Sequence, residues 1–168
     1  MSEVLENKET MESDSIESVT DAITNLLETL VPPKEIEIID IFGDTYKVTS
    51  SVSARKQILI LREFDKMKEI SLTPTTAANG SMASIVAMIV DIAMNESVFE
   101  AICKCFYLAH PDVAEEARKK AKKAKLKIED NHLGVGDLFS IEEIVAGIVP
   151  LFIRLARRTG TALSILSK

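Results

Sequence analysis

Apolar and polar residues alternate in two short segments of this chain. Ile36 and Ile38 alternate with glutamates, and Tyr46 and Val48 alternate with a threonine and a lysine. The Gly-Asp pair between the two segments is typical of a tight turn. A period of two residues on both sides of a turn predicts a β-hairpin at about residues 35–50.

The hydrophobic period changes to about 3.6 residues directly after the hairpin. This pattern predicts an amphipathic helix from about Ala54 to Ile70, opened by Ser53. Its large apolar residues recur at helical spacing and are expected to form one face. They are Ile58, Leu59, Leu61, Phe64 and Met67.

Helical periodicity also predicts five further helices. They are expected at about residues 15–30, 82–94, 97–109, 112–127 and 140–158, with loops at residues 71–81 and 131–137. Residues 82–94 are apolar nearly all round, which predicts a buried helix capped at its end by Asn95, with Ser97 capping the next one. Residues 112–127 are rich in alanine, lysine and glutamate and are expected to face solvent.

The last helix has the clearest signals for its ends. Ser140 and Glu143 have the spacing of a capping box, and Phe139 and Ile144 that of a hydrophobic staple. Proline 150 should kink the helix because it lacks a backbone N–H. Glycine 160 is expected just after its end.

Together these patterns predict a mostly α fold with a small β-hairpin, in the α+β class. Five to six helices should pack on an N-terminal two-stranded hairpin within one domain, residues 14–168. Residues 1–13, short of apolar side chains, are expected to form a disordered acidic tail. The apolar content of 46% is ample for a core, which must be aliphatic because aromatic residues make up only 5%.

Charge is distributed unevenly along the chain. The formal net charge is −6, yet residues 1–30 hold eight acidic side chains and one basic one. Residues 118–127 hold seven basic side chains and no acidic one. This basic run suits either a solvated helix face or contact with an acidic partner, nucleic acid or acidic lipid; the lack of aromatic residues within it argues against nucleic acid.

The sequence shows no signature of catalysis, of a cofactor or of a metal. Cys103 and Cys105 are spaced so that they point about 200° apart on a helix, which prevents both from binding one ion. Buried, reduced cysteines are therefore expected. No apolar run reaches the roughly 20 residues that cross a bilayer, and the acidic start is unlike a signal peptide. We expect a cytosolic protein that is not an enzyme, with no membrane partner.

The layout resembles that of a phage tail assembly chaperone of the small, mostly helical kind. The hairpin EIEIIDIFGDTYKVTS leads into the helix ARKQILILREFDKM; an apolar helix pair over residues 82–109 follows, and DLFSIEEIVAGIVPLFIRL closes the pattern. The resemblance covers roughly residues 34–158. It implies a non-enzymatic protein of the host cytoplasm that binds the tape measure protein and helps to recruit tail tube subunits.

A chaperone of this kind needs an apolar surface for a long amphipathic helix. We expect it to be formed by large apolar residues of the two amphipathic helices: Ile58, Leu61, Phe64, Ile144, Ile148 and Phe152. Self-association through the hairpin edge is a further expectation. The alternatives are a structural tail or baseplate subunit, which would stay in the virion, and a cytosolic helical adaptor.

Overall fold

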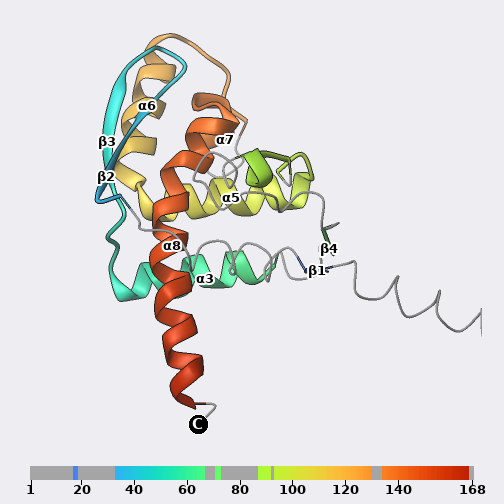
Figure 1. Cartoon of the computed structure of the whole chain (residues 1–168). Helices are drawn as coiled ribbons and strands as arrows, with labels where there is room; N and C mark the ends of the chain where they lie inside the picture. Colours follow the sequence, from blue (N-terminus) through green and yellow to red (C-terminus); the bar gives the residue numbers. More distant parts are fainter. Residues whose placement is uncertain are drawn as a thin grey trace, which may run out of the picture.

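The computed structural model describes residues 17–18, 33–66, 71–72, 87–91, 93–129 and 134–166; for 17–18, 71–72 and 156–166 only the backbone is considered. Figure 1 shows α3 and α5 side by side, with α8 crossing both and α6 beside the β2–β3 hairpin. The elements are β1 (Glu17–Ser18), β2 (Glu35–Ile39), β3 (Thr45–Thr49), α3 (Ala54–Asp65), β4 (Ser71–Leu72), α5 (Glu96–Ala109), α6 (Pro111–Lys123), α7 (Val135–Leu138) and α8 (Ile141–Leu166). This arrangement confirms the predicted fold class.

The hairpin forms where the alternating pattern predicts it. β2 and β3 pair antiparallel, with Ile36 opposite Val48 and Ile38 opposite Tyr46. These inward-facing residues are buried or half-buried, whereas the residues between them are exposed. At the turn, Gly43 has a φ of +85°, a left-handed conformation that a glycine adopts without strain.

Helix α3 begins as predicted but is rotated differently from the expected packing. The Ser53 hydroxyl accepts a hydrogen bond from the backbone N–H of Lys56, at 3.4 Å. The buried residues of α3 are Ile60 and Glu63, not the predicted apolar row. The helix ends at Asp65, before the predicted end, and residues 67–70 lie outside the described residues.

Helices α5 and α6 meet at His110, close to the predicted boundary. Asn95, not Ser97, caps α5, because its side-chain oxygen accepts hydrogen bonds from the N–H groups of Ser97 and Val98. Pro111 occupies the first turn of α6, where its missing N–H costs nothing. One face of α6 is buried through small residues alone: Ala114, Ala117 and Ala121.

Helix α8 is longer than predicted. Its 26 residues continue through Pro150 and Gly160 to Leu166, so the expected end at Arg158 is wrong. Residues 135–138 form the short helix α7, which overlaps the loop predicted at residues 131–137. The Ser140 oxygen accepts from the Glu143 N–H at 3.3 Å, which confirms the predicted cap. The kink at Pro150 stays a prediction.

Two short strands replace predicted helix and loop. Glu17 and Ser18 pair antiparallel with Leu72 and Ser71, whereas residues 15–30 were predicted to be helical and residues 71–81 a loop. The helical prediction is wrong at residues 17–18 because a strand partner competes for the same backbone groups. The remainder of that helix, the acidic tail and most of residues 71–81 lie outside the described residues. In the predicted helix 82–94, residues 87–91 are helical, with Met88 and Ile89 buried.

The core is centred on the crossing of α5 and α8. Phe106 is fully buried and packs against Phe139 with ring centroids 5.1 Å apart. Gly147 of α8 lies against this ring, and a Cβ added there would be 2.6 Å from Cε2 of Phe106. The absence of a side chain at Gly147 therefore permits the close approach of the two helices.

We expect Gly147→Ala to destabilise the protein by about 1–3 kcal/mol, since the added methyl group forces Phe106 out of a filled core. Urea unfolding measures this change. Gly136→Ala is the matched control: its Cβ would be 3.0 Å from Cζ of Phe99, which is only half-buried and can shift. Equal losses in the two variants would contradict the account of this crossing.

Candidate functional site

The described surface carries two groups of exposed large apolar residues on different elements. We call Ile58, Leu59 and Leu61 of α3 the α3 row. We call Ile39, Ile41 and Phe42 the hairpin tip. Because soluble proteins rarely expose clustered apolar residues without a use for them, these two surfaces are the candidates for binding.

The α3 row is exposed because the opposite side of the helix is held inside. Ile60 is fully buried, and Phe64 packs on Phe152 of α8 with ring centroids 4.9 Å apart. Ile58 lies about half a helical turn away from these contacts and is 54% exposed, whereas Leu61, three positions before Phe64, lies at the edge of the buried side and is 36% exposed. A partner could reach both without any rearrangement of the core.

Glu63 fixes this rotation of α3 electrostatically. Its buried carboxylate is bonded by Lys104 of α5 at 2.8 Å and by Lys66 at 2.6 Å. Burial alone would raise the pKa of this carboxyl, but hydrogen bonds from Lys104 and Lys66 outweigh it, so the pKa lies below its ordinary value. Glu63 therefore stays charged and ties α3 to α5.

The structure separates the six predicted partner-binding residues into two groups. Ile144, Ile148 and Phe152 are buried in the core, so the expected groove at this part of α8 is wrong: these side chains pack on the protein itself. Phe64 is half-buried against Phe152. Only Ile58 and Leu61 remain accessible to a partner, and Leu59 adjoins them.

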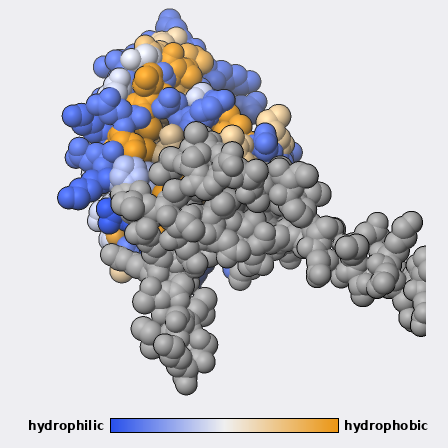
Figure 2. All heavy atoms as spheres, viewed as in Figure 1, coloured by the Kyte–Doolittle hydropathy of each residue, from blue (hydrophilic) through white to orange (hydrophobic). Residues whose placement is uncertain are grey.

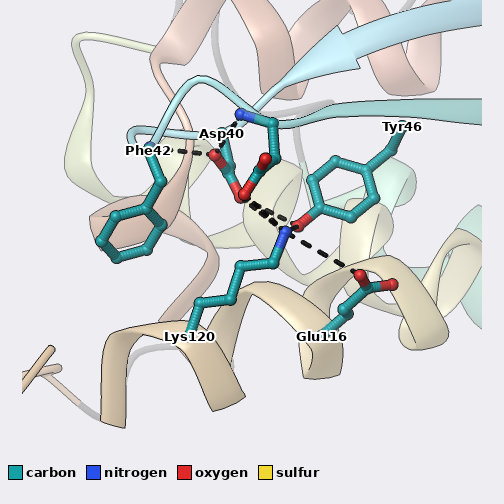
Figure 3. Close-up of polar contacts among 6 residues, drawn as sticks. Asp40, Phe42, Tyr46, Glu116 and Lys120 are labelled. Atoms are coloured by element: carbon teal, nitrogen blue, oxygen red, sulfur yellow. Dashed lines mark hydrogen bonds and ion pairs between the residues drawn. The ribbon is translucent and has the colours of Figure 1, made fainter. Parts of the chain in front are cut away.

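The hairpin edge was expected to mediate self-association, but the residues of the hairpin tip were not predicted as a site. The tip is shaped by the Asp40 side chain. One carboxylate oxygen of Asp40 accepts from the N–H groups of Phe42 and Asp44 at 2.9 and 3.0 Å. The other accepts from the Tyr46 hydroxyl at 2.8 Å. Figure 3 shows Asp40 between Phe42 and Tyr46, with Lys120 of α6 below. With its polar groups turned inward, the turn directs its apolar side chains outward.

Lys120 attaches α6 to the hairpin at the same place. Its ammonium group donates to Asp44 at 2.7 Å and to the Tyr46 hydroxyl at 2.6 Å, and lies 4.8 Å from the centre of the Tyr46 ring. The hydrogen bond to Asp44, followed by that to Tyr46, raises the pKa of Lys120. Burial raises the pKa of Tyr46, so the phenol stays protonated and can donate to Asp40.

The reactive residue types serve structure in the described part of the chain. Burial raises the pKa values of Cys103 and Cys105 to about 12, which leaves both as neutral thiols. Among the described residues, no group of three or more histidine, cysteine or acidic side chains could hold a metal ion. His110 is buried, and its Nε2 lies 2.8 Å from the Gly147 carbonyl oxygen, to which it must donate.

We expect Asp40→Ala to lower the free energy of unfolding by about 2–4 kcal/mol, because it leaves two backbone N–H groups and the Tyr46 hydroxyl without their acceptor. Urea unfolding measures the loss. Asp44→Ala is the control, since that carboxylate is exposed and should contribute less than about 1 kcal/mol. A larger effect at Asp44 than at Asp40 would contradict this ranking.

His110 should make stability fall in acid. Burial, together with the nearby Lys56 charge, lowers the pKa of His110 below its ordinary value of 6.5, against the effect of the Gly147 hydrogen bond. The stabilisation is complete above about pH 6.5 and is lost as the pH falls toward the folded-state pKa, because the unfolded chain takes up the proton first. His110 can change the free energy of unfolding by at most about 1.4 kcal/mol per pH unit.

The free energy of unfolding should therefore fall more steeply between pH 7.5 and 5 for the native chain than for His110→Gln. The glutamine keeps an N–H donor for Gly147 but does not titrate. The carboxylates contribute equally to both curves and cancel in the comparison. Parallel curves would show that His110 does not contribute to the pH dependence.

No helix within the described residues is long and apolar enough to span a bilayer. Comparison of the chain with models of protein families, with curated proteins and with solved structures gives no match.

Proposed function

We propose that this protein is a non-enzymatic binding protein that holds an apolar helical segment of a partner on the α3 row. The observation that carries the proposal is the exposure of Ile58 and Leu61 on a helix whose opposite side is anchored by Glu63 and Phe64. Ile58 and Leu61, three positions apart, share one side of a rigid helix and suit the apolar face of an amphipathic helix, with Leu59 beside Ile58 at the edge of this surface. Their rigidity limits the entropy that binding would cost.

More specifically, we propose a phage tail assembly chaperone that binds the tape measure protein and helps to recruit tail tube subunits in the host cytoplasm. The support is the layout of the sequence: a hairpin, an amphipathic helix, an apolar helical region and a capped apolar helix. The order of β2, β3, α3, α5 and α8 is compatible with it. A long helical partner would present many apolar residues that aggregate unless they are covered.

A structural tail or baseplate subunit is the second candidate, and the β3 edge bears on it. The register turns the backbone groups of Thr45, Lys47 and Thr49 outward, and in the described part of the chain no hydrogen bond to them is found. Such an edge could add a strand from another copy. Lys47 lies at its centre, however, and an edge lysine opposes pairing. Presence in purified particles at fixed copy number would favour the structural subunit; absence would favour the chaperone.

Co-expression with the tape measure protein of the same genome tests the proposed surface. We expect the double substitution Ile58→Asp and Leu61→Asp to weaken co-purification at least about tenfold, because charges replace the contact residues. The free energy of unfolding should change by less than about 1 kcal/mol, since both side chains are exposed. Circular dichroism and urea unfolding measure the second quantity.

Ile148→Asp is the contrasting variant. Ile148 is fully buried, so an unpaired carboxylate there should cost more than about 4 kcal/mol and unfold the chain. Full binding by the folded Ile58→Asp, Leu61→Asp variant would exclude the α3 row as the binding surface. Failure of the native chain to bind the tape measure protein would exclude the chaperone role.

A further inference from the structure

The hairpin tip is a rigid apolar projection. Ile39, Ile41 and Phe42 are 46%, 49% and 38% exposed, and the inward hydrogen bonds of Asp40 hold the turn that carries them. The opposite side of the turn is fixed as well, because the Ile41 N–H donates to the Leu138 carbonyl at 2.9 Å. In Figure 2 an apolar area lies just below the topmost, hydrophilic atoms, in the region where Figure 1 places the hairpin turn and the segment after α6.

Lysines flank this projection. Lys120 joins α6 to the turn through Asp44, and Lys123 follows one helical turn later on the same face. Within the described residues, none of the other lysines in this stretch forms an ion pair. These exposed lysines are Lys119, Lys122, Lys123, Lys125 and Lys127. Leu126, 43% exposed, adds another apolar residue among them.

The shape of this surface favours a lipid interface over a protein helix or a nucleic acid. A bound helix requires a groove, whereas the apolar residues here lie on a protruding turn. Within the described residues, a shallow depression that includes hairpin residues lies at the other end of the hairpin, beside Pro33, Ser50 and Pro150. Single-stranded nucleic acid requires several stacking aromatics, and the tip has one, Phe42.

The distribution of charge is compatible with an anionic surface. Residues 1–30 alone carry a formal charge of −7, so the rest of the chain is close to neutral although the total is −6. Charges act over about 8 Å at physiological ionic strength. Beside the tip, Asp44 and Glu116 are paired with Lys120, which leaves the five exposed lysines at residues 119–127 as the positive charges at the contact.

We propose that the hairpin tip and the adjoining lysines dock this protein on an anionic lipid surface. Ile39, Ile41 and Phe42 enter the headgroup region, and the lysines lie beside the lipid phosphates and carboxylates. This surface lies on different elements from the α3 row and does not depend on the proposed function. A partner held on α3 would remain accessible while the tip is docked.

Sedimentation of the full-length chain with lipid vesicles tests the proposal. We expect binding to vesicles of phosphatidylcholine mixed with phosphatidylserine, little binding to phosphatidylcholine alone, and weakening as salt is added. The double substitution Ile41→Ser and Phe42→Ser should weaken binding at least about tenfold, because it removes the apolar contact. Lys122→Glu with Lys123→Glu should abolish the preference for phosphatidylserine.

Matched controls use exposed residues elsewhere. Met94→Ser removes a large apolar side chain that is 80% exposed, and Arg55→Glu with Arg62→Glu reverses two exposed charges on α3. Both should bind vesicles as the native chain does, and circular dichroism should show all variants folded. No binding to anionic vesicles, or equal losses in tip and control variants, would overturn the proposal. Binding to polyglutamate but not to vesicles would instead assign the surface to an acidic protein.

Discussion

The contact between Phe106 of α5 and Gly147 of α8 is the constraint on which the rest of the described fold depends. A side chain at Gly147 would collide with the Phe106 ring, so the two helix axes can approach closely only because this residue is a glycine. The Gly147 carbonyl also accepts the hydrogen bond from His110, at the junction of α5 and α6. One residue thus fixes the crossing of two helices and the direction in which a third departs.

The hairpin and α3 are attached to this crossing by paired polar groups. Glu143 at the start of α8 accepts from the Ile39 N–H at 2.9 Å, and Arg154 donates to Ser50 at 2.5 Å. Glu63 binds Lys104 of α5. Ser50 and Glu63 are buried, and a buried polar group is costly unless it is paired, so these two contacts set the positions of the hairpin end and of α3.

The two exposed apolar surfaces are consequences of these attachments. Pairing of Glu63 turns Ile58 and Leu61 of α3 to the solvent. Pairing of Asp40 does the same at the hairpin turn, where its hydrogen bonds direct the polar groups inward. In this protein each paired carboxylate, Glu63 or Asp40, is accompanied by exposed apolar side chains nearby. We propose that these apolar side chains are exposed because they bind other molecules.

The sequence by itself determined the local elements, because they depend on neighbouring residues. Alternation predicted the hairpin, Ser53 and Ser140 marked the starts of α3 and α8, and the Gly43 turn lies where expected. Propensity could not predict that α8 would continue through Gly160, where the penalty of one glycine is only about 1 kcal/mol.

Only the tertiary structure decided which faces are buried. The spacing of apolar residues predicted that Ile58 and Leu61 lie on the apolar face of α3, yet both are exposed. The side of α3 that is buried is the one that carries Glu63, which pairs with Lys104, 41 positions later in the chain. On α8 the apolar residues predicted to bind a partner instead fill the core. Such choices depend on partners distant in sequence, and a local pattern contains no information about them.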